Sequence, residues 1–108
     1  MYQGTTPSIT LTIAGRDLSG CTVEVYIAQA AVRIVKRDAR VEADAEGTTV
    51  ACALTQKETL SLTPGPAFVQ VRWIDAQGTA EATDEAQLNV KRILDRTVIE
   101  YAGGEGDE

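Results

Sequence analysis

Apolar and polar residues alternate along most of this chain with a repeat of two residues. The first such run sets Ile9, Leu11 and Ile13 against Thr10 and Thr12. This alternation is typical of a β-strand with one buried face, whereas a helix repeats every 3.6 residues or so. The same pattern predicts further strands at residues 23–27, 32–34, 41–43, 50–54, 68–75, 79–83 and 88–90.

Stretches rich in glycine, proline or charge separate these predicted strands. Turns are expected at 15–20, at 46–47 and at 75–78, where a glycine can supply a positive φ. The polar connection at 36–40 predicts that the strand at 41–43 pairs back on the strand at 32–34 as a hairpin.

One short helical turn is expected at 55–60. Thr55 stands three residues before Glu58, which is the spacing of a capping box, and Pro64 and Pro66 stop the segment that follows. No other stretch could form the crossover helix that a parallel sheet needs. About seven short strands, with turns every 8–12 residues or so, predict an antiparallel β-sandwich or barrel.

The chain has 108 residues, enough for one domain. We expect a single sandwich over residues 1–101 and a disordered acidic, glycine-rich tail over 102–108. The net charge of −6 disfavours nucleic acid as a partner, because binding to its backbone needs a positive field. No leader resembling a signal peptide is seen and no apolar run reaches membrane-spanning length, so assembly in the cytoplasm without membrane insertion is expected.

The sequence lacks the side chains on which most catalysis depends. It contains no histidine, which removes the commonest general base and metal ligand. Cys21 and Cys52 lie in phase with apolar residues, and burial suppresses the reactivity of a thiol. A partial likeness of residues 42–47 to a calcium loop fails because Ala53 occupies the position of the final glutamate. We therefore expect no enzyme activity, no cofactor and no metal.

Candidate interaction residues lie on the strand with the clearest alternation, at 68–75, and beyond the last predicted strand, at 88–90. Trp73 shares a face with Val69 and Val71, which predicts that it belongs to the core. The opposite face presents Gln70 and Arg72 as candidate contact residues. The basic cluster of Lys36, Arg37 and Arg40 is interpreted as a solvated turn rather than as a binding site.

A second candidate lies at residues 92–101. It carries the apolar side chains Ile93, Leu94, Val98 and Ile99, followed by Tyr101. Two interpretations are open. The segment can fold back and cap the sandwich, or it can serve as an arm that docks on a neighbouring subunit.

Several stretches along the chain form a recognisable pattern when they are taken together. They are ITLTI at 9–13, DLSG at 17–20, VEVYI at 23–27, LTQKETL at 54–60 and VQVRW at 69–73. This pattern resembles small β-sandwich proteins of phage and prophage tails and baseplates, with a layout similar to the N-terminal domain of siphophage baseplate upper proteins. The resemblance covers about residues 5–99, and the chain lacks the long fibre region of those proteins.

The resemblance implies an immunoglobulin-like antiparallel β-sandwich without catalytic activity or cofactor. It also implies a structural role in a virion, with other tail proteins or further copies of the chain as partners. A carbohydrate- or cell-surface-binding module of the same shape is the alternative, although such modules need exposed aromatic side chains and this chain has few.

Overall fold

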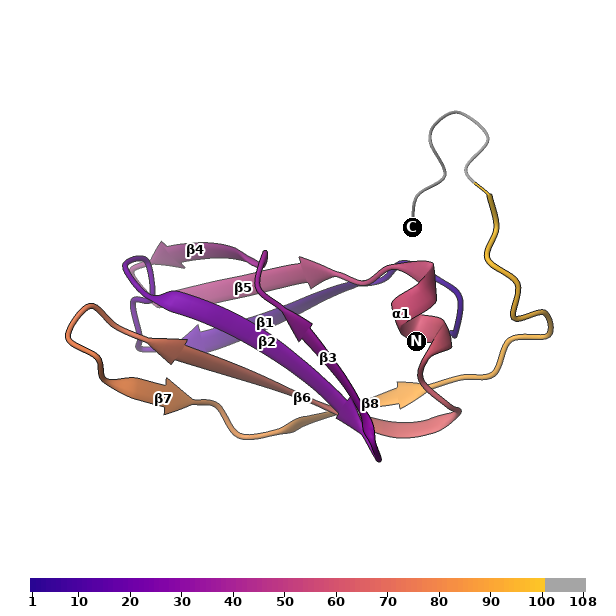
Figure 1. Ribbon diagram of the computed structural model, residues 1–108. Helices are drawn as coiled ribbons and strands as arrows, with labels where there is room; N and C mark the ends of the chain where they lie inside the picture. Colours follow the sequence, from indigo (N-terminus) through magenta and orange to yellow (C-terminus); the bar gives the residue numbers. More distant parts are fainter. Residues whose placement is uncertain (101–108) are drawn as a thin grey trace.

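Two antiparallel β-sheets face each other in the computed structural model, which describes residues 1–100 (Figure 1). One sheet has the strand order β1-β5-β4, and the other has the order β3-β2-β6-β7, with β8 also paired to β6. The elements are β1 (Ser8–Ala14), β2 (Thr22–Gln29), β3 (Val32–Lys36), β4 (Arg40–Asp44), β5 (Gly47–Ala53), α1 (Gln56–Leu60), β6 (Gly65–Ile74), β7 (Ala80–Ala82) and β8 (Ala86–Val90).

The strand order is that of an immunoglobulin-like sandwich, which confirms the expected fold class. In immunoglobulin lettering, β4, β5 and β1 correspond to strands D, E and B. The second sheet corresponds to C′, C, F and G. The place beside strand B, where immunoglobulin domains carry strand A, holds no strand of the described chain. The edge of β1 is therefore left without a partner strand there.

A bulge divides the last edge strand into β7 and β8, as the separate predicted strands at 79–83 and 88–90 indicated. Arg72 pairs with Ala82 and Val69 with Ala86, so the edge strand carries one residue more than β6 between these pairs. Thr83 bridges the interruption. Its N–H donates to the Val71 carbonyl at 2.9 Å, and its hydroxyl accepts from the Val71 N–H at 3.1 Å.

The predicted hairpin between the third and fourth strands is wrong. β4 pairs with β5, and the 36–40 connection crosses from one sheet to the other. The tight turn after Asp44 decides this pairing, because the Asp44 carboxylate accepts N–H groups from Glu46 at 2.8 Å and Gly47 at 3.2 Å. Lys36, the last residue of β3, forms an ion pair with Glu58 of α1. Arg37, the next residue, forms an ion pair with Glu24 of β2.

The capping box at the start of α1 is confirmed. The Thr55 hydroxyl accepts the Glu58 N–H at 3.1 Å, and the Glu58 carboxylate accepts the Thr55 N–H at 2.9 Å. The same carboxylate receives Lys36 Nζ at 3.1 Å, and both side chains are largely shielded from solvent. This ion pair ties the short helix to the end of β3.

The core lies between the sheets and consists mainly of aliphatic side chains. Val25, Ile27, Val50 and Val71 are fully buried, and Trp73 is only 8% exposed, as its phase predicted. Each such aliphatic side chain contributes about 1.5–3 kcal/mol by leaving water. The core therefore derives its stability from many moderate contributions rather than from aromatic stacking.

Both cysteines are free thiols in separate parts of the sandwich. Cys52 on β5 is 7% exposed, and Cys21 before β2 is half-buried. Burial raises the pKa of the Cys52 thiol; the nearby positive charge of Lys36 lowers it to a smaller extent, and the carboxylates of Asp38 and Glu58 raise it a little further. The reactive thiolate is disfavoured at this position.

We expect alkylation to distinguish the two thiols. In folded protein at neutral pH, iodoacetamide should modify Cys21 first, because Cys52 is both buried and protonated. Peptide mapping by mass spectrometry measures the two rates. Equal rates in folded protein would contradict the buried position of Cys52, and equal rates in denaturant serve as the control.

Candidate interaction site

The outer face of the larger sheet holds the first pair of candidate residues. Register places Glu24 opposite Arg72 and Tyr26 opposite Gln70. The Arg72 guanidinium lies 5.6 Å from the centroid of the Tyr26 ring, and Gln70 Nε2 donates to the Thr83 carbonyl at 2.8 Å. Both candidates lie on the predicted face, but both already make contacts within their own sheet.

The Glu24 carboxylate on this face accepts two hydrogen bonds from neighbouring side chains. It accepts a hydrogen bond from the Tyr26 hydroxyl and another from Arg37 Nε at 2.8 Å. These contacts favour the charged form and lower the pKa of Glu24 below its ordinary 4.5, with the Tyr26 hydroxyl making the largest contribution. The stabilisation that they provide is present above pH 4.5 and is lost as pH falls through the lowered pKa.

An NMR titration of the Glu24 side-chain carboxyl checks this arrangement. Its midpoint should lie below 4.5 in the folded protein and should move up toward that value in Tyr26→Phe. The substitution removes the hydroxyl donor and keeps the ring. A midpoint at or above 4.5 in the unmodified protein would show that the network does not form in solution.

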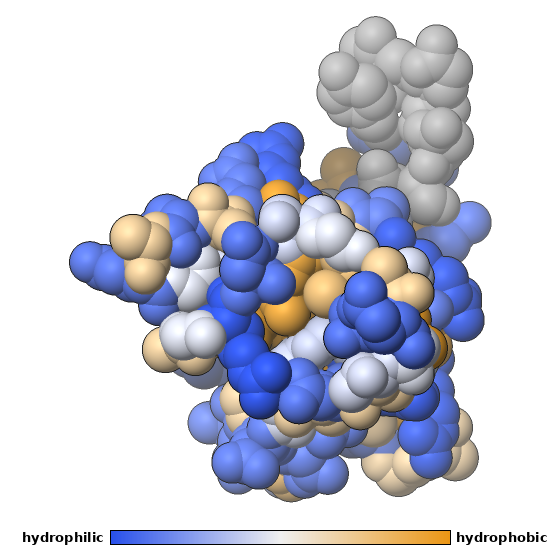
Figure 2. All heavy atoms as spheres, turned by 90° about the vertical axis from the view of Figure 1, so that its left-hand side faces the viewer, coloured by the Kyte–Doolittle hydropathy of each residue, from blue (hydrophilic) through white to orange (hydrophobic). Residues whose placement is uncertain are grey.

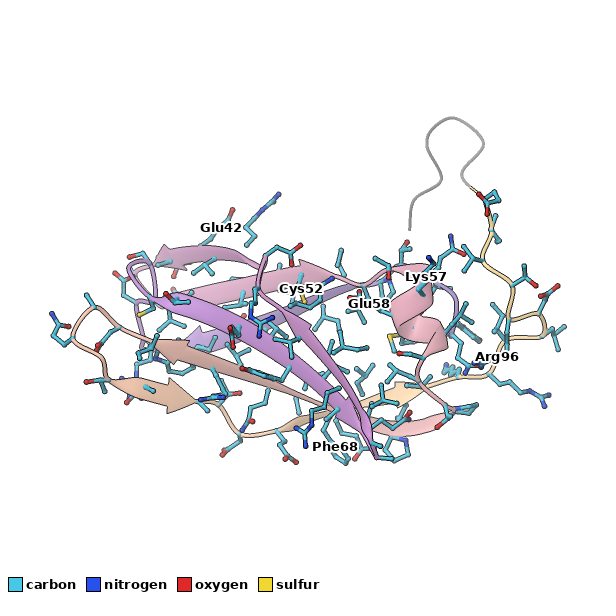
Figure 3. The ribbon with its side chains drawn as sticks, viewed as in Figure 1. Glu42, Cys52, Lys57, Glu58, Phe68 and Arg96 are labelled. Carbon is cyan, nitrogen blue, oxygen red and sulfur yellow. The ribbon has the colours of Figure 1, made fainter. Side chains whose placement is uncertain are left out.

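The second candidate, the 92–100 segment, has no regular secondary structure and runs past α1 at one end of the sandwich (Figure 1). Side chains and backbone of α1 hold it. The Gln56 side chain donates to the Ile99 carbonyl at 3.0 Å and accepts the Ile99 N–H at 2.8 Å. Arg96 lies beside the same helix (Figure 3) and donates to the Leu60 carbonyl at 2.8 Å.

A buried glutamine anchors the start of this segment, and sequence patterning did not reveal it. Gln3 is fully buried, and its Nε2 donates to the Leu62 carbonyl at 2.6 Å. Its Oε1 accepts the Ile93 N–H at 3.4 Å, and its backbone N–H donates to the Lys91 carbonyl at 3.0 Å. One side chain thus joins residues near the N-terminus, the end of α1 and the segment after β8. A polar residue in an apparently polar lead carries no periodic signal that could have indicated this role.

The apolar residues of the 92–100 segment divide into two sets. Ile93 and Val98 are half-buried, and Ile93 packs close to Gly4 and Leu60 at the end of the sandwich. Leu94 is 95% exposed and Ile99 is 74% exposed. Both side chains border a hollow of about 490 Å³, which Ile93, Val98 and Gly4 also line. Tyr101, the last predicted contact residue, and the predicted tail at 102–108 lie outside the described residues.

The opposite end of the sandwich is also hollowed. Figure 2 shows apolar atoms at the bottom of an opening whose rim carries both hydrophilic residues and residues of intermediate hydropathy. A groove of about 520 Å³ opens between β1 and β7, lined by Ile13, Trp73 and Ala82 among others. Arg16 bridges the groove to Glu81 with an N–O distance of 2.8 Å, and both side chains are exposed. Such an exposed pair adds little stability.

Within residues 1–100 no cluster of three or more histidine, cysteine or acidic side chains is positioned to hold a metal ion. No helix in the described part of the chain is long and apolar enough to cross a membrane.

Comparison with known proteins identifies no relative. No family model matches this chain, and neither the curated proteins nor the solved structures contain a match.

Proposed function

We propose that this protein is a non-catalytic structural part of a phage or prophage tail or baseplate. It works by protein–protein contact through the outward side of the 92–100 segment. The observation that carries the proposal is the exposure of Leu94 and Ile99 on a segment whose backbone is already held in place. Its expected partners are other tail proteins or further copies of this chain.

Two exposed aliphatic side chains beside a hollow form a suitable anchor for a partner. Burying a leucine or isoleucine side chain contributes about 1.5–3 kcal/mol, so covering both supports a specific contact. The hydrogen bonds from Gln56 and Arg96 fix the segment before a partner arrives. Less conformational entropy is then lost on binding, and more of the burial energy appears as affinity.

The immunoglobulin-like sandwich and the resemblance to baseplate proteins support placing this contact in a tail. A sandwich of this kind positions loops and segments at its ends on a rigid frame, which suits a part that spaces or joins others. Function still has to be argued from the contact surface, because the fold serves many unrelated roles.

Protein composition of purified particles tests the proposal. Phage particles from the strain that carries this gene should contain the chain at a fixed ratio to other tail proteins, as measured by quantitative mass spectrometry. An abundant host cytoplasmic protein serves as the control for carry-over. Absence of the chain from intact particles and from partly assembled tails would contradict a structural role.

A further inference from the structure

The sandwich has four strand edges, and three of them are protected against pairing with another chain. β4 carries Arg40, Glu42 and Asp44, and β3 carries Arg33 and Lys36. The edge formed by β7 and β8 is broken by the bulge at Thr83. Charges and bulges of this kind are the usual devices that prevent edge-to-edge association.

β1 has none of these devices. Its sequence, SITLTIA, contains no charged residue and no proline, and threonine and isoleucine favour extended backbone. β1 pairs with β5 over its full length and with no other strand of residues 1–100. Figure 1 shows it at the side of its sheet opposite β4.

The hydrogen bonds that flank β1 show which backbone groups point away from β5. Gly15 N–H donates to the Glu46 carbonyl and Leu54 N–H donates to the Pro7 carbonyl, each at 3.0 Å. In an antiparallel pair the bonded residues alternate, so the odd-numbered residues of β1 bond to β5. The N–H and C=O groups of Ser8, Thr10, Thr12 and Ala14 therefore point toward the open edge.

Side chains next to this edge are incompletely covered. Ile9 and Leu11 face the core but remain half-exposed, whereas Ile13 at the end of the strand is buried. Their exposure follows from the vacant position of strand A. A strand added beside β1 would therefore pair its backbone and cover these two side chains.

We propose that the β1 edge is an interface for a second copy of this chain, with two β1 strands pairing antiparallel across a two-fold axis. The axis passes through Leu11. Ser8 then pairs with Ala14 of the second copy and Thr10 with its Thr12, so every outward-pointing group finds a partner. In this register, residues 8–14 of the two copies overlap over their full length. The even-numbered residues, whose backbone groups point toward the open edge, then lie opposite one another.

The same register matches the side chains on both faces of the strand. Leu11 meets Leu11 of the second copy and Ile9 meets Ile13 on the core side, while threonines pair on the outer side. Aliphatic pairs and threonine pairs are both favourable cross-strand neighbours. The joined sheet runs β4-β5-β1-β1-β5-β4. This interface is distinct from the 92–100 segment and does not depend on the contact proposed for that segment.

Sedimentation equilibrium of the full chain at increasing concentration tests the interface. The unmodified protein should reach a dimer below about 1 mM, and Thr12→Pro, which removes an N–H at the open edge, should weaken dimerisation at least about tenfold. Thr10→Lys should have the same effect without altering the backbone. Thr22→Lys adds the same charge on the other sheet and serves as the matched control.

A cross-link checks the register. In a background with Cys21→Ser and Cys52→Ala, Leu11→Cys should form a disulfide-linked dimer on mild oxidation, because Leu11 faces itself across the axis. Thr22→Cys should not. A chain that stays monomeric, or a dimer that both Thr10→Lys and Thr12→Pro leave unchanged, overturns the proposal. A dimer lost only in the Leu94→Ser/Ile99→Ser variant also overturns it and assigns association to the 92–100 segment.

Discussion

Gly47→Ala is expected to lower the free energy of unfolding by about 3–5 kcal/mol, at the upper end for a single substitution. Gly47 begins β5 between β1 and β4, with φ at +152°. A Cβ at this position would lie 2.3 Å from the Ile13 carbonyl oxygen and 2.9 Å from Ala14 Cα. Both atoms belong to the backbone of a paired strand, so the clash is relieved only by displacing β1.

Substitutions at two other glycines distinguish the cost of the positive φ from the cost of the steric clash with β1. Gly78 has φ at +89° and open space around it, so Gly78→Ala should cost about 1 kcal/mol from backbone conformation alone. Gly20 has neither a positive φ nor a close neighbour, so Gly20→Ala should be nearly neutral. Urea unfolding followed by circular dichroism measures all three. A Gly47→Ala loss no larger than that of Gly78→Ala would show that β1 and β5 do not approach as closely as described.

Thr48→Val is expected to destabilise the protein by about 2–3 kcal/mol although it preserves the shape of the side chain. Thr48 is fully buried. Its hydroxyl donates to the Arg16 carbonyl at 2.7 Å and accepts the Leu18 N–H at 3.0 Å. Valine leaves both backbone groups without their partner in a place that water reaches poorly, and each such group carries its own penalty.

Thr48→Val should also loosen the loop that follows β1. Thr48 holds this loop, and the loop in turn places the buried Leu18 at the end of the core. In Thr48→Val, hydrogen exchange at the Leu18 amide should become faster than in the unmodified protein. Thr48→Ser keeps the hydroxyl and should retain most of the stability. A Thr48→Val variant that keeps the stability of the unmodified protein, or one that loses less than Thr48→Ser, would contradict the role assigned to the two hydrogen bonds.

Features that depend on neighbouring residues were predictable from the sequence. The alternation around Val25 and Val71 placed the strands and their buried faces, and the spacing of Thr55 and Glu58 placed the helical turn. Both signals are local, because burial on one face and capping each act within a few residues.

Features that depend on distant partners were not predictable in this way. β4 pairs with β5 rather than β3 because of turn chemistry at Asp44 and ion pairs made by Lys36 and Arg37 with remote residues. The role of Gln3 depends on Leu62 and Ile93, which are far from it along the chain. Periodicity contains no information about such contacts.

The candidate site was predicted in part for the same reason. The sequence identified Ile93, Leu94, Val98 and Ile99 as apolar residues beyond the last strand. It could not show which of them face outward, because the 92–100 segment has neither the period of a strand nor that of a helix. Contacts with Gly4 and Gln56 decide that Leu94 and Ile99 are exposed.

The number of infectious particles made by a phage that lacks this gene, complemented from a plasmid, tests the central claim most directly. The unmodified gene should restore the titre, and so should Ile74→Ser, which removes an exposed apolar side chain at the other end of the sandwich. Leu94→Ser/Ile99→Ser should fold normally yet fail to restore infectious particles, because the contact surface is gone. Full restoration by that double variant would contradict assembly through the 92–100 segment.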